Sequence, residues 1–138
     1  MTGLLAEVVT ATRAARPDLI ISAAVFPRWE VHAENFGQCA ETWVESGLLD
    51  FVCPMNYTDN LLDFATWFLG QRKAVAGRVP IIVGIGPFSD ACHFTGPEQL
   101  VEQIEVGRAF GAGGFVIFNY NETFAEEYLP YLAEEATE

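Results

Sequence analysis

The stretch LLDFVCPMNYTDN, residues 48–60, decides the fold that the rest of the sequence is predicted to adopt. It begins as a short apolar run, the pattern of a buried strand, and changes after Pro54 into a segment rich in hydrogen-bonding side chains. Proline cannot donate to a sheet ladder, so we expect pairing to weaken there and Asn56 and Tyr57 to point toward the mouth of the sheet. Asp50 stands at the opposite, amino end of this strand, where we predict a structural role for its carboxylate.

The same alternation of strand and helix recurs along the chain. Apolar runs flanked by breakers predict four strands buried on both faces, and these runs begin near residues 19, 48, 80 and 114. Segments with helical periodicity lie between them and at both ends, and the last, residues 122–138, is predicted to bend or break at Pro130. A spacing of about 30 residues suits βα units joined by right-handed crossovers, which place the strands in parallel.

Four such units predict an α/β chain that is either an open doubly wound sheet or half of a closed barrel. We find no linker, domain boundary or low-complexity tract, so residues 1–138 are predicted to form a single (β/α)4 unit. No GxGxxG or GxxxxGK[ST] cradle follows any strand, which argues against nucleotide binding. The glycines at residues 84–86 are predicted instead to let a crowded strand end bend or to let a ligand approach the backbone.

Charge and hydropathy exclude several classes of partner. The 138 residues include 7 Lys and Arg against 19 Asp and Glu, for a formal net charge of −12. Nucleic acids and anionic membrane surfaces both need a basic face, so neither is a predicted partner. No apolar run approaches the roughly 18 residues of a membrane span. The N-terminal segment also lacks the basic n-region of a secretory signal.

The sequence predicts no cofactor and no metal site. The three cysteines lie far apart without CxxC spacing, which fits neither a disulfide framework nor a zinc site. His32 and His93 fall in different predicted loops and form no HxH or HExxH pattern. Ser89, Asp90 and His93 do not predict a catalytic triad, because no GxSxG elbow holds the serine.

The carboxyl ends of the predicted strands carry the polar and aromatic side chains of interest. In parallel α/β folds, ligands bind outside these ends. Aromatic faces suit the C–H faces of a sugar, and amides and carboxylates suit its hydroxyls, so the set favours a carbohydrate-like ligand. The alternative is that these aromatic side chains only close the top of the core. The residues predicted to contact the ligand are Arg28, Trp29, Met55, Asn56, Tyr57, Asn119 and Tyr120.

Two acids are the principal candidates for catalysis, Asp59 and Glu30. Asp59 follows the second predicted strand most closely. Its alternative role is to cap the helix that starts near Leu61, because aspartate is a favoured N-cap residue. Asp90 and Glu122 also follow strand ends, and the sequence does not decide among these four.

Four motifs, taken in order and spacing, resemble a known family. They are AVFPRW at residues 24–29, ETWVESGLLDFVCPMNYT at residues 41–58, PIIVGIG at residues 80–86 and GAGGFVIFNYN at residues 111–121. Together they resemble the second half of the glycosyl-hydrolase-like family 10 proteins, which are (β/α)8 TIM barrels. The most specific element is Trp43, then Gly47, then Asp-hydrophobic-hydrophobic-x-Pro-Met-x-Tyr from Asp50 to Tyr57.

The resemblance implies that the chain corresponds to strands five to eight of such a barrel, preceded by the helix after strand four. It implies a hydrolase acting on glycosidic bonds in polysaccharide, in the cell envelope or secreted. The motif Asp-Gly-h-h-h-Asp-Tyr-h-Arg-Tyr, which carries an important acid at the end of strand four, is absent here. Glycoside hydrolysis normally needs two carboxyl groups. The resemblance therefore implies that part of the catalytic machinery lies in an N-terminal half, and whether this chain is itself an enzyme stays open.

Two further hypotheses belong to other classes of protein. The chain could be a non-catalytic module that binds carbohydrate or another small polar ligand. Half a barrel exposes two sheet edges and an apolar inner face, which proteins rarely leave uncovered, so this hypothesis predicts a homo-oligomer. Alternatively, the four units form a complete open-sheet domain with a regulatory or scaffolding role.

Overall fold

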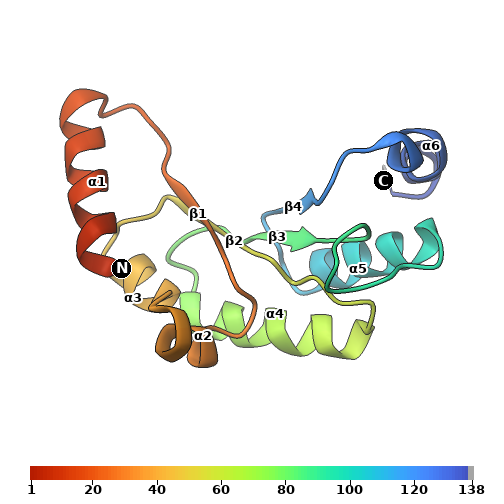
Figure 1. Ribbon diagram of the computed structural model, residues 1–138, viewed down its shortest axis with the longest axis horizontal. Helices are drawn as coiled ribbons and strands as arrows, with labels where there is room; N and C mark the ends of the chain where they lie inside the picture. The colour runs from red at the N-terminus through yellow and green to blue at the C-terminus, as the bar shows by residue number, and fades with distance from the viewer. Residues whose placement is uncertain (137–138) are drawn as a thin grey trace.

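The computed structural model describes residues 1–136 and contains short parallel strands alternating with helices (Figure 1). The elements in chain order are α1 (Thr2–Ala15), β1 (Ser22–Val25), α2 (Trp29–Phe36), α3 (Ala40–Glu45), β2 (Phe51–Pro54), α4 (Leu61–Val75), β3 (Ile82–Ile85), α5 (Pro97–Ala109), β4 (Gly114–Ile117), the π-helix η1 (Phe124–Tyr128) and α6 (Leu129–Glu135).

The strands form two parallel two-stranded sheets that are joined by bridges. β1 pairs with β2, and β3 pairs with β4, both in parallel. Parallel bridges between Val52 and Ile81 and between Met55 and Gly84 connect β2 to β3. The strands therefore lie in the order β1-β2-β3-β4, each next to its neighbour in sequence. The predicted α/β class with parallel strands is confirmed.

The core lies between the strands and one layer of helices. Figure 1 shows α2, α3, α4 and α5 on the same side of the strands. Successive strand residues point to opposite faces, so every second residue meets this layer. Val25, Val52 and Val83 are buried on that side, whereas Ala24 and Val116 are exposed on the other. We call this second side, away from the helices, the open face.

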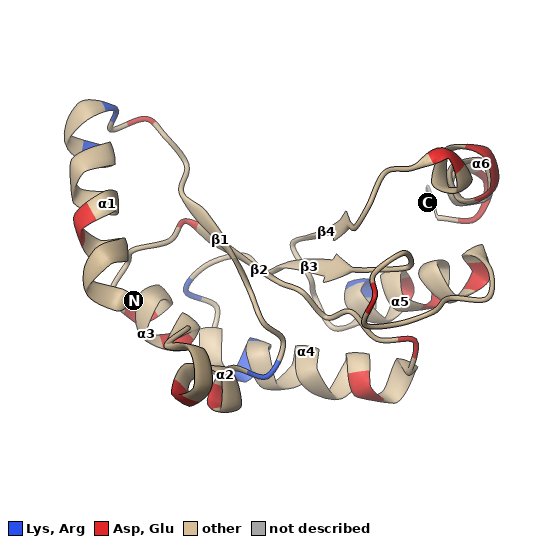
Figure 2. Cartoon of the chain, viewed as in Figure 1, with Lys and Arg blue, Asp and Glu red and all other residues tan. Residues whose placement is uncertain are grey.

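Two helices contribute most of the large side chains that pack against the strands. Phe64 and Phe68 of α4 stand one turn apart and are fully buried, and Leu100 and Ile104 repeat this spacing on α5. Residues four positions apart lie on one face of a helix, so each pair forms a continuous apolar stripe. Charged side chains lie on helices and connecting segments, and the strands carry none (Figure 2).

The structural role predicted for Asp50 is confirmed. Its Oδ2 accepts a hydrogen bond of 2.7 Å from the backbone N–H of Ile21, and its Oδ1 accepts one of 3.3 Å from the Arg13 guanidinium. One carboxylate thus joins the approach to β1, the start of β2 and the last turn of α1. In a parallel pair the amino ends of both strands meet at one edge, which is why a single side chain reaches both.

Helix α2 was not predicted from the sequence. It begins at Trp29 and ends before Gly37, which has the left-handed φ of 67° that favours glycine. Trp29 is the only buried residue of its eight positions. The segment therefore lacks the 3.6-residue apolar periodicity that predicts a helix from sequence, and Trp29 is the residue by which the helix joins the core.

The C-terminal segment is helical without a gap from residue 122 to residue 135, as predicted, and its irregularity is a π-helical stretch that ends just before Pro130. The π-helix η1 comes first, and α6 follows with Pro130 in its first turn. Proline is tolerated there because the first N–H groups of a helix have no intrahelical acceptor. The last two residues of the predicted helix lie outside the described residues. Among residues 1–136, none of the helices is both long enough and apolar enough to cross a membrane.

Candidate functional site

Just beyond the carboxyl end of β2, the side chains of Asn56 and Tyr57 point to opposite faces of the strands. Asn56 is fully buried and faces α4, where its amide is paired with that of Gln71. Asn56 Nδ2 donates to Gln71 Oε1 at 3.0 Å, and Gln71 Nε2 donates to Asn56 Oδ1 at 2.7 Å. Gln71 Nε2 also donates to the Pro27 carbonyl at 2.8 Å. The expectation that Asn56 and Tyr57 both point toward the mouth is therefore corrected, because strand alternation continues past Pro54.

Tyr57 lies on the open face, and Gly86, just beyond β3, makes room for its ring. A Cβ atom added to Gly86 would lie 2.6 Å from Tyr57 Cγ, and one added to Gly84 would lie 3.4 Å from Tyr57 Cε1. The distance at Gly86 is far below any real contact, so a side chain there would displace the ring. Gly86 thus lets the Tyr57 ring approach the backbone, whereas a Cβ at Gly84 would lie 2.8 Å from the Pro54 carbonyl oxygen. Burial raises the pKa of the Tyr57 hydroxyl above its ordinary value.

Tyr57 stacks on Phe118, which the sequence analysis did not single out. Their ring centroids are 5.5 Å apart and the ring planes differ by 20°. Phe118 is 45 % exposed, and its backbone N–H donates to the Ile85 carbonyl at 2.8 Å, which extends the pairing of β3 and β4. We call Tyr57 and Phe118 the aromatic pair. Strand alternation could have identified Phe118, since it follows the open-face residue Val116 by two positions.

Asp59 is exposed and lies against the segment that follows β3. Its Oδ2 accepts a hydrogen bond of 3.3 Å from the backbone N–H of His93. The neighbouring thiol of Cys92 is buried and donates to the Gly86 carbonyl at 2.8 Å. Burial raises the pKa of this thiol to about 11, and the charge of Asp59 adds to the shift. Asp59 therefore stands close to the glycine that supports Tyr57.

The alternative role of Asp59 as the cap of α4 is wrong. Asn60 caps this helix, because its Oδ1 accepts hydrogen bonds from the backbone N–H of Leu62 at 2.9 Å and of Asp63 at 3.1 Å. Asparagine and aspartate are equally good N-cap residues, so sequence preference alone does not choose between adjacent positions. The result leaves the Asp59 carboxylate available outside the helix.

The residues predicted at the end of β1 lie in or beside the helix layer. Trp29 is 7 % exposed and belongs to α2, as does the exposed Glu30. Both line a cavity whose other walls come from α3 and α4. Arg28 is exposed and precedes α2, and its backbone N–H donates to His32 Nδ1 at 3.2 Å.

The remaining predicted residues lie at or beyond the ends of β2 and β4. Met55 is half-buried on the open face. Asn119 and Tyr120 are exposed beyond β4, and the Tyr120 ring meets Phe124 edge-on at a centroid distance of 5.8 Å. In the part of the chain that the structure describes, no three His, Cys, Asp or Glu side chains form a group that could hold a metal ion.

Comparisons with known proteins add no assignment to this geometry. No protein-family model matches the chain, and a search of curated proteins finds no match. The functional argument therefore depends on the aromatic pair, Asp59 and their supports.

Replacing Asn60 and Asp59 with alanine, one at a time, tests which of the two residues caps α4. We expect Asn60→Ala to lower the free energy of unfolding by about 1 kcal/mol, because it removes the N-cap acceptor. We expect Asp59→Ala to lower it by less than Asn60→Ala does, because Asp59 is exposed and loses only the 3.3 Å hydrogen bond from the His93 N–H. Urea denaturation followed by circular dichroism measures both. A larger loss for Asp59→Ala would contradict the capping assignment.

Adding one methyl group beneath the Tyr57 ring tests the glycine support. We expect Gly86→Ala to destabilise the protein by about 1 to 3 kcal/mol, because the new Cβ overlaps the ring. Gly70→Ala is the matched control, since Gly70 lies within α4 with no atom within 4 Å of its added Cβ. The control is expected to stabilise by roughly 0.5 to 1 kcal/mol through helix propensity. Equal, small effects in thermal unfolding would rule out the close packing.

Proposed function

We propose that this chain is the C-terminal part of a glycoside hydrolase that acts on polysaccharide. The aromatic pair is the observation that carries this proposal. Tyr57 and Phe118 present stacked rings on the open face at the carboxyl ends of β2 and β4, and Phe118 remains 45 % exposed. Ligands of parallel α/β folds bind at this edge. Exposed rings beside amides and carboxylates suit a sugar, which has both C–H faces and hydroxyl groups.

The strand order supports the proposal that the four units are half of a (β/α)8 barrel. Each strand lies beside its neighbour in sequence, all run in parallel, and the intervening helices lie on one side. A barrel of this type places its helices outside and its strands inside. On this proposal the open face is part of the barrel interior, and β1 to β4 correspond to strands five to eight.

Asp59 is the carboxylate that we propose for catalysis. It follows β2 on the same segment as Tyr57 and is bonded to the segment after β3. Glu30, the other candidate, belongs to α2 and lines the cavity in the helix layer, so its position favours another role. Since glycoside hydrolysis needs a second carboxyl group, we assign that group to an N-terminal half of the barrel.

The other predicted ligand residues have different proposed roles. Met55, Asn119 and Tyr120 lie at or beyond strand ends and are proposed to flank the sugar. Asn56 is proposed to position Tyr57 through its bonds with Gln71. Arg28 is proposed to border the site beyond β1.

Removing the rings tests the sugar site. We expect Tyr57→Ala and Phe118→Ala each to weaken binding of soluble oligosaccharides by about tenfold, because each removes one stacking face. Phe36→Ala is the matched control, since Phe36 is an exposed aromatic residue of α2. Isothermal titration of the protein against cello-, xylo- and chito-oligosaccharides measures the affinities. Equal affinities for the two ring variants and the control would refute the assignment.

A second candidate function, a self-associating binding module without catalysis, is favoured by the apolar open face. Val116 and Phe118 are 46 % and 45 % exposed there. Exposed apolar side chains that lie side by side mark a surface that a partner covers. A second copy of this chain would bury both open faces at once.

Sedimentation velocity distinguishes the two candidates. Self-association predicts that the mean mass rises with protein concentration, and that Val116→Lys returns the protein to a monomer. Leu69→Lys is the control, because Leu69 is 48 % exposed on α4 and lies off the open face. A wild-type protein that stays monomeric at high concentration would eliminate the self-associating module.

A further inference from the structure

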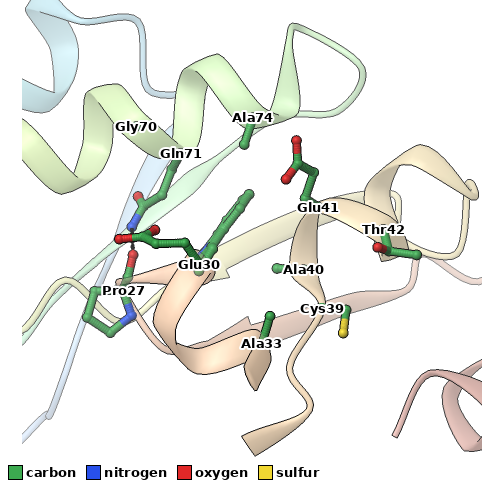
Figure 3. A pocket seen from close by; sticks show the side chains of 11 residues that line it. Pro27, Glu30, Ala33, Cys39, Ala40, Glu41, Thr42, Gly70, Gln71 and Ala74 are labelled. Atoms are coloured by element: carbon green, nitrogen blue, oxygen red, sulfur yellow. Dashed lines mark hydrogen bonds between the residues drawn. The ribbon is translucent and has the colours of Figure 1, made fainter. Parts of the chain in front are cut away.

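A cavity of about 240 Å³ lies between α2, α3 and α4, in the helix layer rather than on the open face (Figure 3). None of Met55, Tyr57, Asp59, Asn119 or Tyr120 lines it. Much of its wall is made of small side chains, which leaves space between the helices. Figure 3 shows Ala33 from α2, Ala40 at the start of α3 and Ala74 from α4 around this space.

Trp29 brings an unpartnered donor to this cavity. The side chain lines the space and is 93 % buried, yet its Nε1 has no hydrogen-bond acceptor among the described residues. Buried indole N–H groups normally find a partner, and leaving one unsatisfied is costly. The amide of Gln71, which also lines the cavity, already bonds to Asn56 and Pro27. An occupant of the cavity with an oxygen acceptor would satisfy the Trp29 donor.

The charged walls of the cavity are negative. Glu30 from α2 and Glu41 from α3 both line it, and Figure 3 shows their carboxylates on separate elements around the space. No Lys or Arg lines it. Carboxylates beside a tryptophan ring favour a cation, which gains charge attraction from the acids and a cation–π contact from the ring.

We infer that this cavity binds a small aliphatic amine that also carries a hydroxyl group. Its ammonium groups, one or two in number, would pair with Glu30 and Glu41, and the hydroxyl oxygen would accept the hydrogen bond from Trp29. The volume suits a small ligand, because pockets for drug-sized molecules begin near roughly 300 Å³. This inference is independent of the proposed sugar site, which lies on the open face and uses other residues.

Diaminopropanol is the probe, and glycerol, which replaces both ammonium groups with hydroxyls, is its uncharged counterpart. We expect calorimetric titration to detect diaminopropanol and no heat from glycerol. Glu30→Gln and Glu41→Gln should each weaken binding about fivefold, as expected for exposed carboxylates. Glu34→Gln, an exposed position of α2 outside the cavity, removes the same charge and should leave binding unchanged. Equal losses in all three variants would mean unspecific attraction to an acidic protein and would overturn the inference.

Two further variants test the cavity and the donor. Ala33→Leu fills the space without changing charge and should abolish binding. Wild type should prefer diaminopropanol over diaminopropane about fivefold, and Trp29→Phe, which keeps a ring but lacks the N–H, should remove this preference. Circular dichroism establishes that each variant is folded, and the glutamine variants serve where Trp29→Phe does not fold. Absence of diaminopropanol binding at millimolar concentration, or binding that survives Ala33→Leu, would overturn the inference.

Discussion

The paired amides of Asn56 and Gln71 are the interaction on which this arrangement depends. Both side chains are almost completely buried, where an unpaired amide would be costly. Their two mutual hydrogen bonds and the third to the Pro27 carbonyl are all made only when the ends of β1 and β2 meet α4 in one register. A second buried amide links α5 to the segment after β2, where Gln103 Nε2 donates to the Thr58 carbonyl at 2.7 Å.

These hydrogen bonds determine which side chains lie on the open face. With Asn56 held in the helix layer, the next side chain, Tyr57, must lie on the opposite face. Gly86 lets its ring approach the backbone, and Phe118 stacks on it from the carboxyl end of β4. The pair therefore combines a buried support with an exposed ring, which is the physical basis of the sugar-binding proposal.

The two proposed sites lie on opposite sides of the strands and differ in chemistry. The open face offers stacked rings, whereas the cavity in the helix layer offers carboxylates and an indole donor. Gln71 borders both arrangements, since it lines the cavity and holds the residue before Tyr57. Its three hydrogen bonds keep the wall between the two sites in one conformation.

The sequence by itself determined the α/β class, the parallel strands and the structural role of Asp50. These features depend on apolar periodicity, breakers and the reach of short segments, which are local properties. Only the tertiary structure decided that Asn56 turns inward, that Trp29 anchors an unpredicted helix and that Phe118 completes the aromatic pair. Each of these depends on contacts between segments apart in the chain, such as the stacking of Tyr57 on Phe118, because burial is settled by which elements meet rather than by any one segment.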